Sequence, residues 1–407
     1  MKNVMNWTNT FKNLSFISVL SFILYSIVCG VFNLLISLEI EKPQTKKYNK
    51  NLVRATYPNY ANEELEYALK IFKEERAPIV KYRSFIGYRR NEFTGEAISV
   101  NQQGFRLSIN HKIEDSVWFF GGSTMWGTGS DNRRTIPSYF ALKTGDNVLN
   151  LGESSFTSLQ ELIQLQLLLS KGFLPKEVVF YDGVNDGYQF CQNPSKAQIT
   201  HAYSARWSSL DNELRAAKQK LNKAPVIDLD KLGTPIIKFY RSPLIYFQNR
   251  MIRADEWLDK LSGVPISSIR KSKRYLYCDD PMIAKEAAKI TINSWRSAAA
   301  ILKSRGVPAW FVLQPSANYM PQNYRLDYLI SSKKQAIINE KDSYKLYYQS
   351  VRSQFLSSCE QFGDCDSFID LSELFFGIDA HLFIDTCHLS PNGNEIVSAA
   401  LADRLRS

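Results

Sequence analysis

The sequence predicts an α/β fold, because strand-length apolar runs alternate with longer segments of helical periodicity. Three such runs, at 117–120, 147–152 and 177–186, are apolar and lead into glycines, as buried strands followed by tight turns do. Leucines recur at 154–170 with the spacing of a helix that packs on a sheet. With about 300 residues beyond the N-terminal region, one large domain accounts for the length.

Helices and strands continue to alternate in the last part of the chain. The expected elements are a helix at 282–305, a strand at 309–315, a helix at 327–358, a strand at 367–371 and a closing helix from 391 to 404. Ser390 and Pro391 are the residue types preferred at the N-cap and the first position of that closing helix.

A serine directly follows the first expected strand. Gly121 and Gly122 let the chain turn where the strand ends, so Ser123 stands just past its carboxyl end. In open α/β sheets this edge is where ligands bind. Glycine-flanked serines also occur in turns of proteins that are not enzymes. A catalytic role for Ser123 is therefore supported only in combination with residues further along the chain.

Those residues supply what an activated serine needs. Asp385 precedes His388 by three residues, a spacing that lets the carboxylate fold back on the imidazole and leaves the other ring nitrogen for Ser123. Asn185 can donate its side-chain N–H to an oxyanion, beside the backbone N–H groups of Ser123 and Gly152. These are the parts of an acyl-transfer site.

At these residues the chain resembles the SGNH (GDSL-type) hydrolase family. The four blocks of that family align with Gly121–Thr124, Gly152, Gly183–Asp186 and Asp385–His388, in the family's order. The combination is far more specific than any single block. The first block departs from the usual Gly-Asp-Ser-Leu, because glycine and threonine replace its aspartate and leucine.

The resemblance implies a three-layer α/β/α sandwich with a parallel sheet. It also implies a catalytic triad of Ser123, Asp385 and His388, with Gly152 and Asn185 completing the oxyanion hole. Such a site needs no cofactor, and none is expected here.

Two further residues are predicted to contact substrate. Segments similar to Asn101–Arg106 precede the serine block in many SGNH proteins, so Arg106 is one candidate, with a structural salt bridge as the alternative for this side chain. Trp126, three residues after Ser123, is the other candidate.

The N-terminal region is predicted to anchor the protein to a lipid bilayer. After a tail at 1–13, residues 14–38 carry no charge and are long enough to cross a membrane as one helix. A cleaved signal peptide is the alternative, but the run exceeds a typical signal h-region and stays apolar past its Cys-Gly pair. Residues 39–100 then form a lysine-rich stalk and a preamble with helical spacing at 62–73.

The orientation of this single-pass anchor has two interpretations. Two lysines precede the run and four follow it; these are Lys2 and Lys12, and Lys42, Lys46, Lys47 and Lys50. This excess after the run by itself favours a cytoplasmic location for the large domain. A long C-terminal domain can translocate regardless of such charges. Because membrane-anchored SGNH proteins commonly modify envelope glycans, we expect a periplasmic or extracellular domain.

Residues 191–277 are predicted to form a mostly helical insertion in the 101–407 domain. The insertion holds 16 Lys and Arg against 7 Asp and Glu, so nine of the chain's ten net positive charges lie in it. One interpretation is a lid or substrate platform whose cations attract an anionic glycan or lipid headgroups; the other is a solvated surface. No motif that reads or stacks bases is present, so nucleic acid is not an expected partner.

The cysteines indicate two possible disulfide bonds. Cys191 and Cys278 bracket the insertion, and Cys359 and Cys365 are close enough in sequence to close a short loop. Both pairings suit an oxidising periplasm. Each of these residues could instead be a free buried thiol.

Cys387 would then stay unpaired beside His388, and it would act as a nucleophile only if Ser123 did not. His381 lies near this segment and is expected at the surface or behind the triad. No group of His, Cys and Asp has metal-ligand spacing, so no metal is expected. Neither a P-loop nor a dinucleotide fingerprint is found.

These features predict a membrane-anchored serine esterase that acts on acyl groups, chiefly O-acetyl groups, of a cell-envelope glycan. An acylated carbohydrate or another ester is the expected substrate. The alternatives are an O-acyltransferase on the same class of glycan, a catalytically silent glycan-binding or assembly protein on an SGNH scaffold, and an esterase that acts on lipids.

Overall fold

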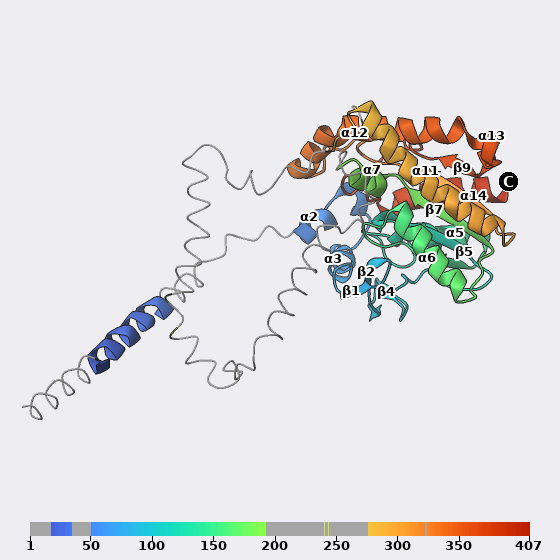
Figure 1. The fold of residues 1–407 in the computed structure, drawn as a ribbon. Helices are drawn as coiled ribbons and strands as arrows, with labels where there is room; N and C mark the ends of the chain where they lie inside the picture. Colours follow the sequence, from blue (N-terminus) through green and yellow to red (C-terminus); the bar gives the residue numbers. More distant parts are fainter. Residues whose placement is uncertain (1–17, 35–49, 193–239, 241–242, 244–275, 322–323) are drawn as a thin grey trace, which may run out of the picture. The chain divides into compact units, whose positions relative to one another are not determined.

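The computed structural model describes residues 18–34, 50–192, 240, 243, 276–321 and 324–407 (Figure 1). The chain divides into two units. One comprises Met1–Tyr48 and Ser208–Arg274, and the other comprises Asn49–Trp207 and Tyr275–Ser407. Only the second unit contains the sheet and the predicted site residues.

In the first unit, residues 18–34 are helical. Tyr25 donates its hydroxyl hydrogen bond to the carbonyl of Tyr240 at 2.8 Å, and the two rings stack with centroids 6.0 Å apart. No helix among the described residues is both long enough and apolar enough to span a bilayer, so the predicted anchor at 14–38 gains no support, and its two ends lie outside those residues. Most of the predicted insertion at 191–277 also lies outside them, including the segments predicted to be helical.

The second unit is built on a five-stranded parallel sheet, and the predicted α/β class is confirmed. Its strands are β5 (Val117–Gly121), β6 (Val148–Asn150), β7 (Glu177–Asp182), β8 (Ala309–Leu313) and β9 (Phe368–Asp370), in the spatial order β6-β5-β7-β8-β9. Every residue of β5 and β7 is buried. Parallel strands covered on both faces have such continuous apolar sequences, which explains why these runs do not alternate.

Helices pack on both faces of this sheet. Those on one face are α6 (Ser158–Ser170), α11 (Pro281–Lys303) and α12 (Ser331–Leu356); those on the other are α5 (Ile136–Thr144) and α14 (Pro391–Arg406). Trp118 and Phe120 of β5 join the first core, whereas Val117 and Phe119 join the second, because successive strand residues point to opposite faces. Helices α11 and α12 lie side by side (Figure 1).

The segment before the sheet packs in the same core as one face of the sheet, and residues 39–49 of the predicted stalk lie outside the described residues. It contains α2 (Lys50–Ala55), η1 (Pro58–Tyr60), α3 (Leu65–Glu74) and two antiparallel hairpins, β1 (Val80–Arg83) with β2 (Gly87–Arg90) and β3 (Phe93–Thr94) with β4 (Ser99–Val100). The helix predicted at 62–73 is confirmed as α3. Tyr60 donates to the carbonyl of Gly129 at 2.6 Å, which ties η1 to the segment after the serine.

Both expected disulfide bonds are present, Cys191–Cys278 and Cys359–Cys365, and Cys387 keeps its thiol. The second bond joins α13 (Cys359–Phe362) to η3 (Cys365–Ser367) just before β9. Ser390 caps α14 as predicted, since its hydroxyl accepts from the backbone N–H of Gly393 at 3.2 Å.

Candidate active site

Ser123 begins the short helix α4 (Ser123–Trp126), directly after β5 and Gly122. The first residue of a helix has no partner for its N–H within the helix, so the backbone of Ser123 has a donor to offer beside its own hydroxyl. A Cβ at position 122 would lie 2.1 Å from Nδ2 of Asn185. Glycine is therefore required at this position, because the Asn185 amide occupies the space that a side chain would need.

The loop from Asp385 to His388 is folded by one carboxylate. Oδ1 of Asp385 accepts hydrogen bonds from the backbone N–H groups of Cys387 at 3.1 Å and His388 at 2.9 Å. Both carboxylate oxygens also lie 2.8 Å from Nδ1 of His388. The three-residue spacing thus lets the same side chain shape the turn and orient the ring, as the sequence predicts.

The imidazole of His388 joins this carboxylate to the serine. Its Nε2 lies 2.6 Å from Oγ of Ser123, although the two residues are 265 positions apart in the chain. Asp385 is only 7% exposed, whereas Ser123 and His388 keep some solvent contact. The three predicted triad residues therefore meet in one hydrogen-bonded chain at the carboxyl edge of the sheet.

The electrostatics of the pair favour a charged carboxylate and a basic imidazole. Burial by itself would raise the pKa of Asp385, but the charge and hydrogen bond of His388 outweigh it and hold that pKa well below its usual range. Burial likewise opposes protonation of His388, yet Asp385 and, to a lesser degree, Cys387 raise the pKa of the imidazole well above its ordinary value. His388 is thus a stronger proton acceptor than an isolated histidine.

Hydrogen bonds to backbone carbonyls hold the histidine loop against its neighbours. Thr124 donates its hydroxyl to the carbonyl of Cys387 at 3.3 Å, which joins α4 directly to this loop. After β8, the backbone N–H of Ala317 donates to the carbonyl of Thr386 at 3.0 Å, and Ser316 donates its hydroxyl to the same atom. The loop that carries His388 is therefore hydrogen-bonded to the segments that follow β5 and β8.

Asn185, the predicted oxyanion donor, lies against Gly122, the residue that precedes Ser123. It is the second residue of α7 (Val184–Phe190), and its Nδ2 donates to the carbonyl of Phe156 at 2.8 Å while lying against Gly122. An amide nitrogen carries two hydrogens, so one remains for a ligand beside Ser123.

A buried carboxylate that the sequence analysis overlooked supports this asparagine. Asp186 accepts from the backbone N–H and hydroxyl of Ser158 and from the hydroxyl of Thr291. Burial raises the pKa of Asp186 to about 6, although its hydrogen bonds with Ser158 and Thr291 act in the opposite direction. Asp186 thereby fixes the start of α7 to the start of α6, and the position of Asn185 follows. The Gly-x-Asn-Asp block contained this residue, but its partners are distant in sequence.

Gly152 does not offer the N–H donor that was expected of it. Its backbone N–H donates to Oδ1 of Asn150 at 3.0 Å, and Nδ2 of Asn150 donates to the carbonyl of Met125 at 3.0 Å. A Cβ at position 152 would lie 2.5 Å from the backbone nitrogen of Trp126. Glycine at 152 therefore allows close approach to α4, and the interpretation of it as an oxyanion donor is not supported by this geometry.

The predictions of Arg106 and Trp126 as substrate contacts are corrected. Both side chains are fully buried, so neither has surface to offer a ligand. Arg106 lies over the Trp126 ring at 4.3 Å and donates to Asn132, to the carbonyl of Ser130 at 2.8 Å and to the carbonyl of Trp126. Burial lowers the pKa of Arg106 to about 9. The two side chains therefore pack against each other in the protein interior, at the end of α4 to which Trp126 belongs.

Two neighbouring side chains, Cys387 and His381, make no contact with the hydroxyl of Ser123, although Cys387 shares Nδ1 of His388 with Asp385. Sγ of Cys387 lies 3.8 Å from Nδ1 of His388, the nitrogen that faces Asp385, and so on the opposite side of the ring from Ser123. The ring of His381 packs edge-on against Tyr328, with centroids 4.7 Å apart.

Across the described ranges, one group of His, Cys, Asp or Glu residues is close enough to share a metal ion, and it consists of Asp385, Cys387 and His388. Two of those three are already bonded to each other as part of the triad. The absence of a metal stays a prediction.

The chain matches no family model and no curated protein. Its function must therefore be inferred from the geometry of the site and from the four sequence blocks.

The corrected role of Arg106 makes a prediction about stability. Replacing it with lysine removes the forked donor that satisfies three acceptors over the indole, so we expect Arg106→Lys to lower the free energy of unfolding by about 1–3 kcal/mol. Urea denaturation measures this. Arg133→Lys, at an exposed arginine in the same segment, is the matched control and should change stability by less than about 0.5 kcal/mol. Equal stability of the two variants would contradict a packing role.

Proposed function

We propose that the protein is a serine acyl hydrolase or acyltransferase of the SGNH (GDSL-type) kind, with Ser123, His388 and Asp385 as its catalytic triad. The observation that carries the proposal is the continuous hydrogen-bonded chain from Asp385 through His388 to Ser123. A nucleophile, a base and a group that orients the base are the three requirements of covalent acyl transfer.

The reaction follows from the atoms in this chain. Oγ of Ser123 attacks the carbonyl carbon of an ester while Nε2 of His388 takes the hydroxyl proton, and the charge of Asp385 stabilises the imidazolium that forms. The backbone N–H of Ser123 and the side-chain amide of Asn185 donate to the oxyanion. His388 then returns its proton to the departing alcohol. Water or an acceptor hydroxyl then attacks the acyl-enzyme while Nε2 of His388 takes its proton. His388 returns this proton to Oγ of Ser123, which frees the serine.

The architecture supports membership of that family. A parallel sheet with helices on both faces carries the serine, asparagine and histidine blocks at one edge, which is the arrangement that a three-layer SGNH sandwich requires. Because fold alone does not determine chemistry, the proposal depends on the site and not on the sandwich.

The proposed substrate is an ester-linked acyl group, chiefly O-acetyl, on a cell-envelope glycan. Two disulfide bonds in the catalytic unit favour an oxidising compartment such as the periplasm or the cell exterior. The uncharged run at 14–38 is the proposed bilayer anchor, on the basis of its composition. The glycan itself is inferred from the family resemblance.

The nucleophile can be tested directly. We expect Ser123→Ala to abolish turnover of a small aryl acetate and labelling by a fluorophosphonate, because Ser123 is the hydroxyl bonded to Nε2 of His388. Cys387→Ala is the matched control and should retain most of both activities, since that thiol lies on the other side of the ring. Folded wild-type protein that neither turns over the ester nor reacts with the probe would favour a silent glycan-binding protein instead.

The pH dependence of turnover tests the roles of His388 and Asp385. Only the neutral imidazole can accept the serine proton, so kcat/KM should rise with pH, and the raised pKa of His388 moves the midpoint above the ordinary value of 6.5. Asp385→Asn removes the charge that raises this pKa, so the midpoint should fall and kcat should drop about 10⁴-fold. His381→Gln should leave the midpoint in place. A midpoint unchanged in Asp385→Asn would argue against this role of Asp385.

A further inference from the structure

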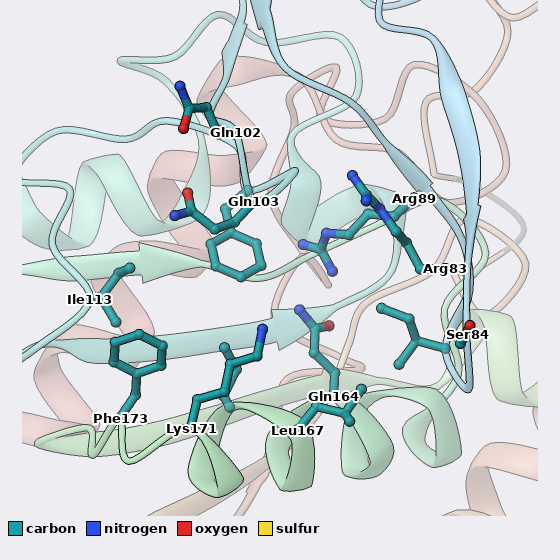
Figure 2. A pocket seen from close by; sticks show the side chains of 13 residues that line it. Arg83, Ser84, Arg89, Gln102, Gln103, Ile113, Gln164, Leu167, Lys171 and Phe173 are labelled. Carbon is teal, nitrogen blue, oxygen red and sulfur yellow. The ribbon is translucent and has the colours of Figure 1, made fainter.

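A cavity of about 480 Å³ lies beside the C-terminal half of α6 (Figure 2). It opens to solvent and is lined by the β1–β2 hairpin, the turn at 102–105 and the helix itself. Its lining combines cationic and amide side chains with apolar ones, and the residues that matter below are Arg89, Gln164, Lys171, Phe105 and Phe173. A volume in this range is typical of sites for small organic ligands.

The cavity is separate from the triad. Helix α6 begins at Ser158, next to Phe156, whose carbonyl accepts the hydrogen bond of Asn185. With a rise of 1.5 Å per residue, Gln164 and Lys171 lie about 9 and 20 Å further along the helix axis. No triad residue lines the cavity.

Arg89 brings a buried positive charge to the wall of this cavity. It is 1% exposed; its Nε donates to the carbonyl of Gly104 at 3.0 Å and its Nη2 to that of Leu151, but Nη1 has no hydrogen-bond partner. Burial lowers the pKa of Arg89 to about 10, and Glu153 acts in the opposite direction. The carboxylate of Glu153 is itself engaged by the backbone N–H and guanidinium of Arg90. A buried cation without an ion partner is costly, and an anion in the cavity would relieve that cost.

The other polar groups converge on the same space. Figure 2 shows the guanidinium of Arg89, the side-chain amide of Gln164 and the amino group of Lys171 pointing toward one another across the cavity. Gln164 is 3% exposed; its unpartnered Oε1 is an acceptor and offers nothing to an anion, whereas its side-chain N–H groups can donate to one. None of the described residues that line the cavity is acidic.

The rest of the wall suits an apolar group. The aromatic rings are Phe105, which the Arg89 guanidinium covers at 4.7 Å, and Phe173, which keeps some solvent contact. The aliphatic side chains are Ile86, Ile113, Leu167 and Leu168. A ligand with only a charged group would leave this surface in contact with water, whereas an amphipathic one would bury it.

We propose that this cavity is a binding site for a small amphipathic anion, a carboxylate or phosphate carried on an apolar chain or ring. The anionic group is held by the guanidinium of Arg89 and the amino group of Lys171, and the apolar body lies between Phe173 and the aliphatic side chains of α6. The site goes beyond the proposed acyl transfer and does not depend on it.

Isothermal titration calorimetry of the full chain tests this with matched probes. Octanoate should bind, whereas octylamine, with the opposite charge, and acetate, which lacks the chain, should bind at least about tenfold more weakly, because each loses one of the two kinds of contact. Octyl phosphate, measured in parallel, should also bind. Whichever of octanoate and octyl phosphate has the lower Kd identifies the preferred anionic group. Octylamine or acetate binding as tightly as octanoate would overturn the proposal.

Variants assign the binding to this cavity. Lys171→Glu, at an exposed position where folding is not at risk, should weaken octanoate binding at least about tenfold, and Arg89→Gln should do so if it folds. Lys289→Glu, an exposed lysine on α11, is the charge-matched control and should bind as the wild type does. Ser123→Ala should also bind normally, which separates this site from the proposed catalysis. Unchanged affinity in Lys171→Glu would refute the assignment.

Discussion

The carboxylate of Asp385 is the group on which the candidate active site depends. It accepts hydrogen bonds from two backbone N–H groups of its own loop and from Nδ1 of His388, so it sets the shape of the turn, the direction of the ring and the affinity of the ring for a proton. Because it is nearly buried, its charge acts on the imidazole with little screening by water. The opposite ring nitrogen is thereby aimed at Ser123.

The surrounding polar contacts follow from the same requirement that buried groups be satisfied. Asn150 fills the space between β6 and α4 by accepting from Gly152 and donating to Met125. Asp186 joins α6 to α7, and its neighbour Asn185 lies against Gly122 as a result. Each of these bonds fixes a loop that follows a strand of the parallel sheet. The site is thus held by the ends of several strands and not by the serine turn alone.

Local sequence was sufficient where a residue's role depends on neighbours in the chain. The apolar runs form strands, as predicted, and Ser390 caps a helix. The spacing of Asp385 and His388 likewise produces a hydrogen-bonded turn. Each of these features depends on contacts within a few residues. Arg106 and Trp126 could not be judged in this way. Their burial arises from packing in which Arg90 lies 3.9 Å from the Trp126 ring and Arg106 lies 4.3 Å from it. The cavity at Arg89 and α6 could not be predicted from the sequence either, since the residues that line it come from segments distant in sequence.

The central claim is that the hydroxyl of Ser123, activated by His388, carries an acyl group during the reaction. Mass spectrometry of protein that has been mixed with an aryl acetate and quenched in acid within the first turnovers tests it most directly. The account predicts a single added acetyl group on the peptide that contains Ser123, and a larger amount of it when transfer to the acceptor is slow. An acetyl group on Cys387, or ester turnover with no acyl-protein at any time point, would contradict the account.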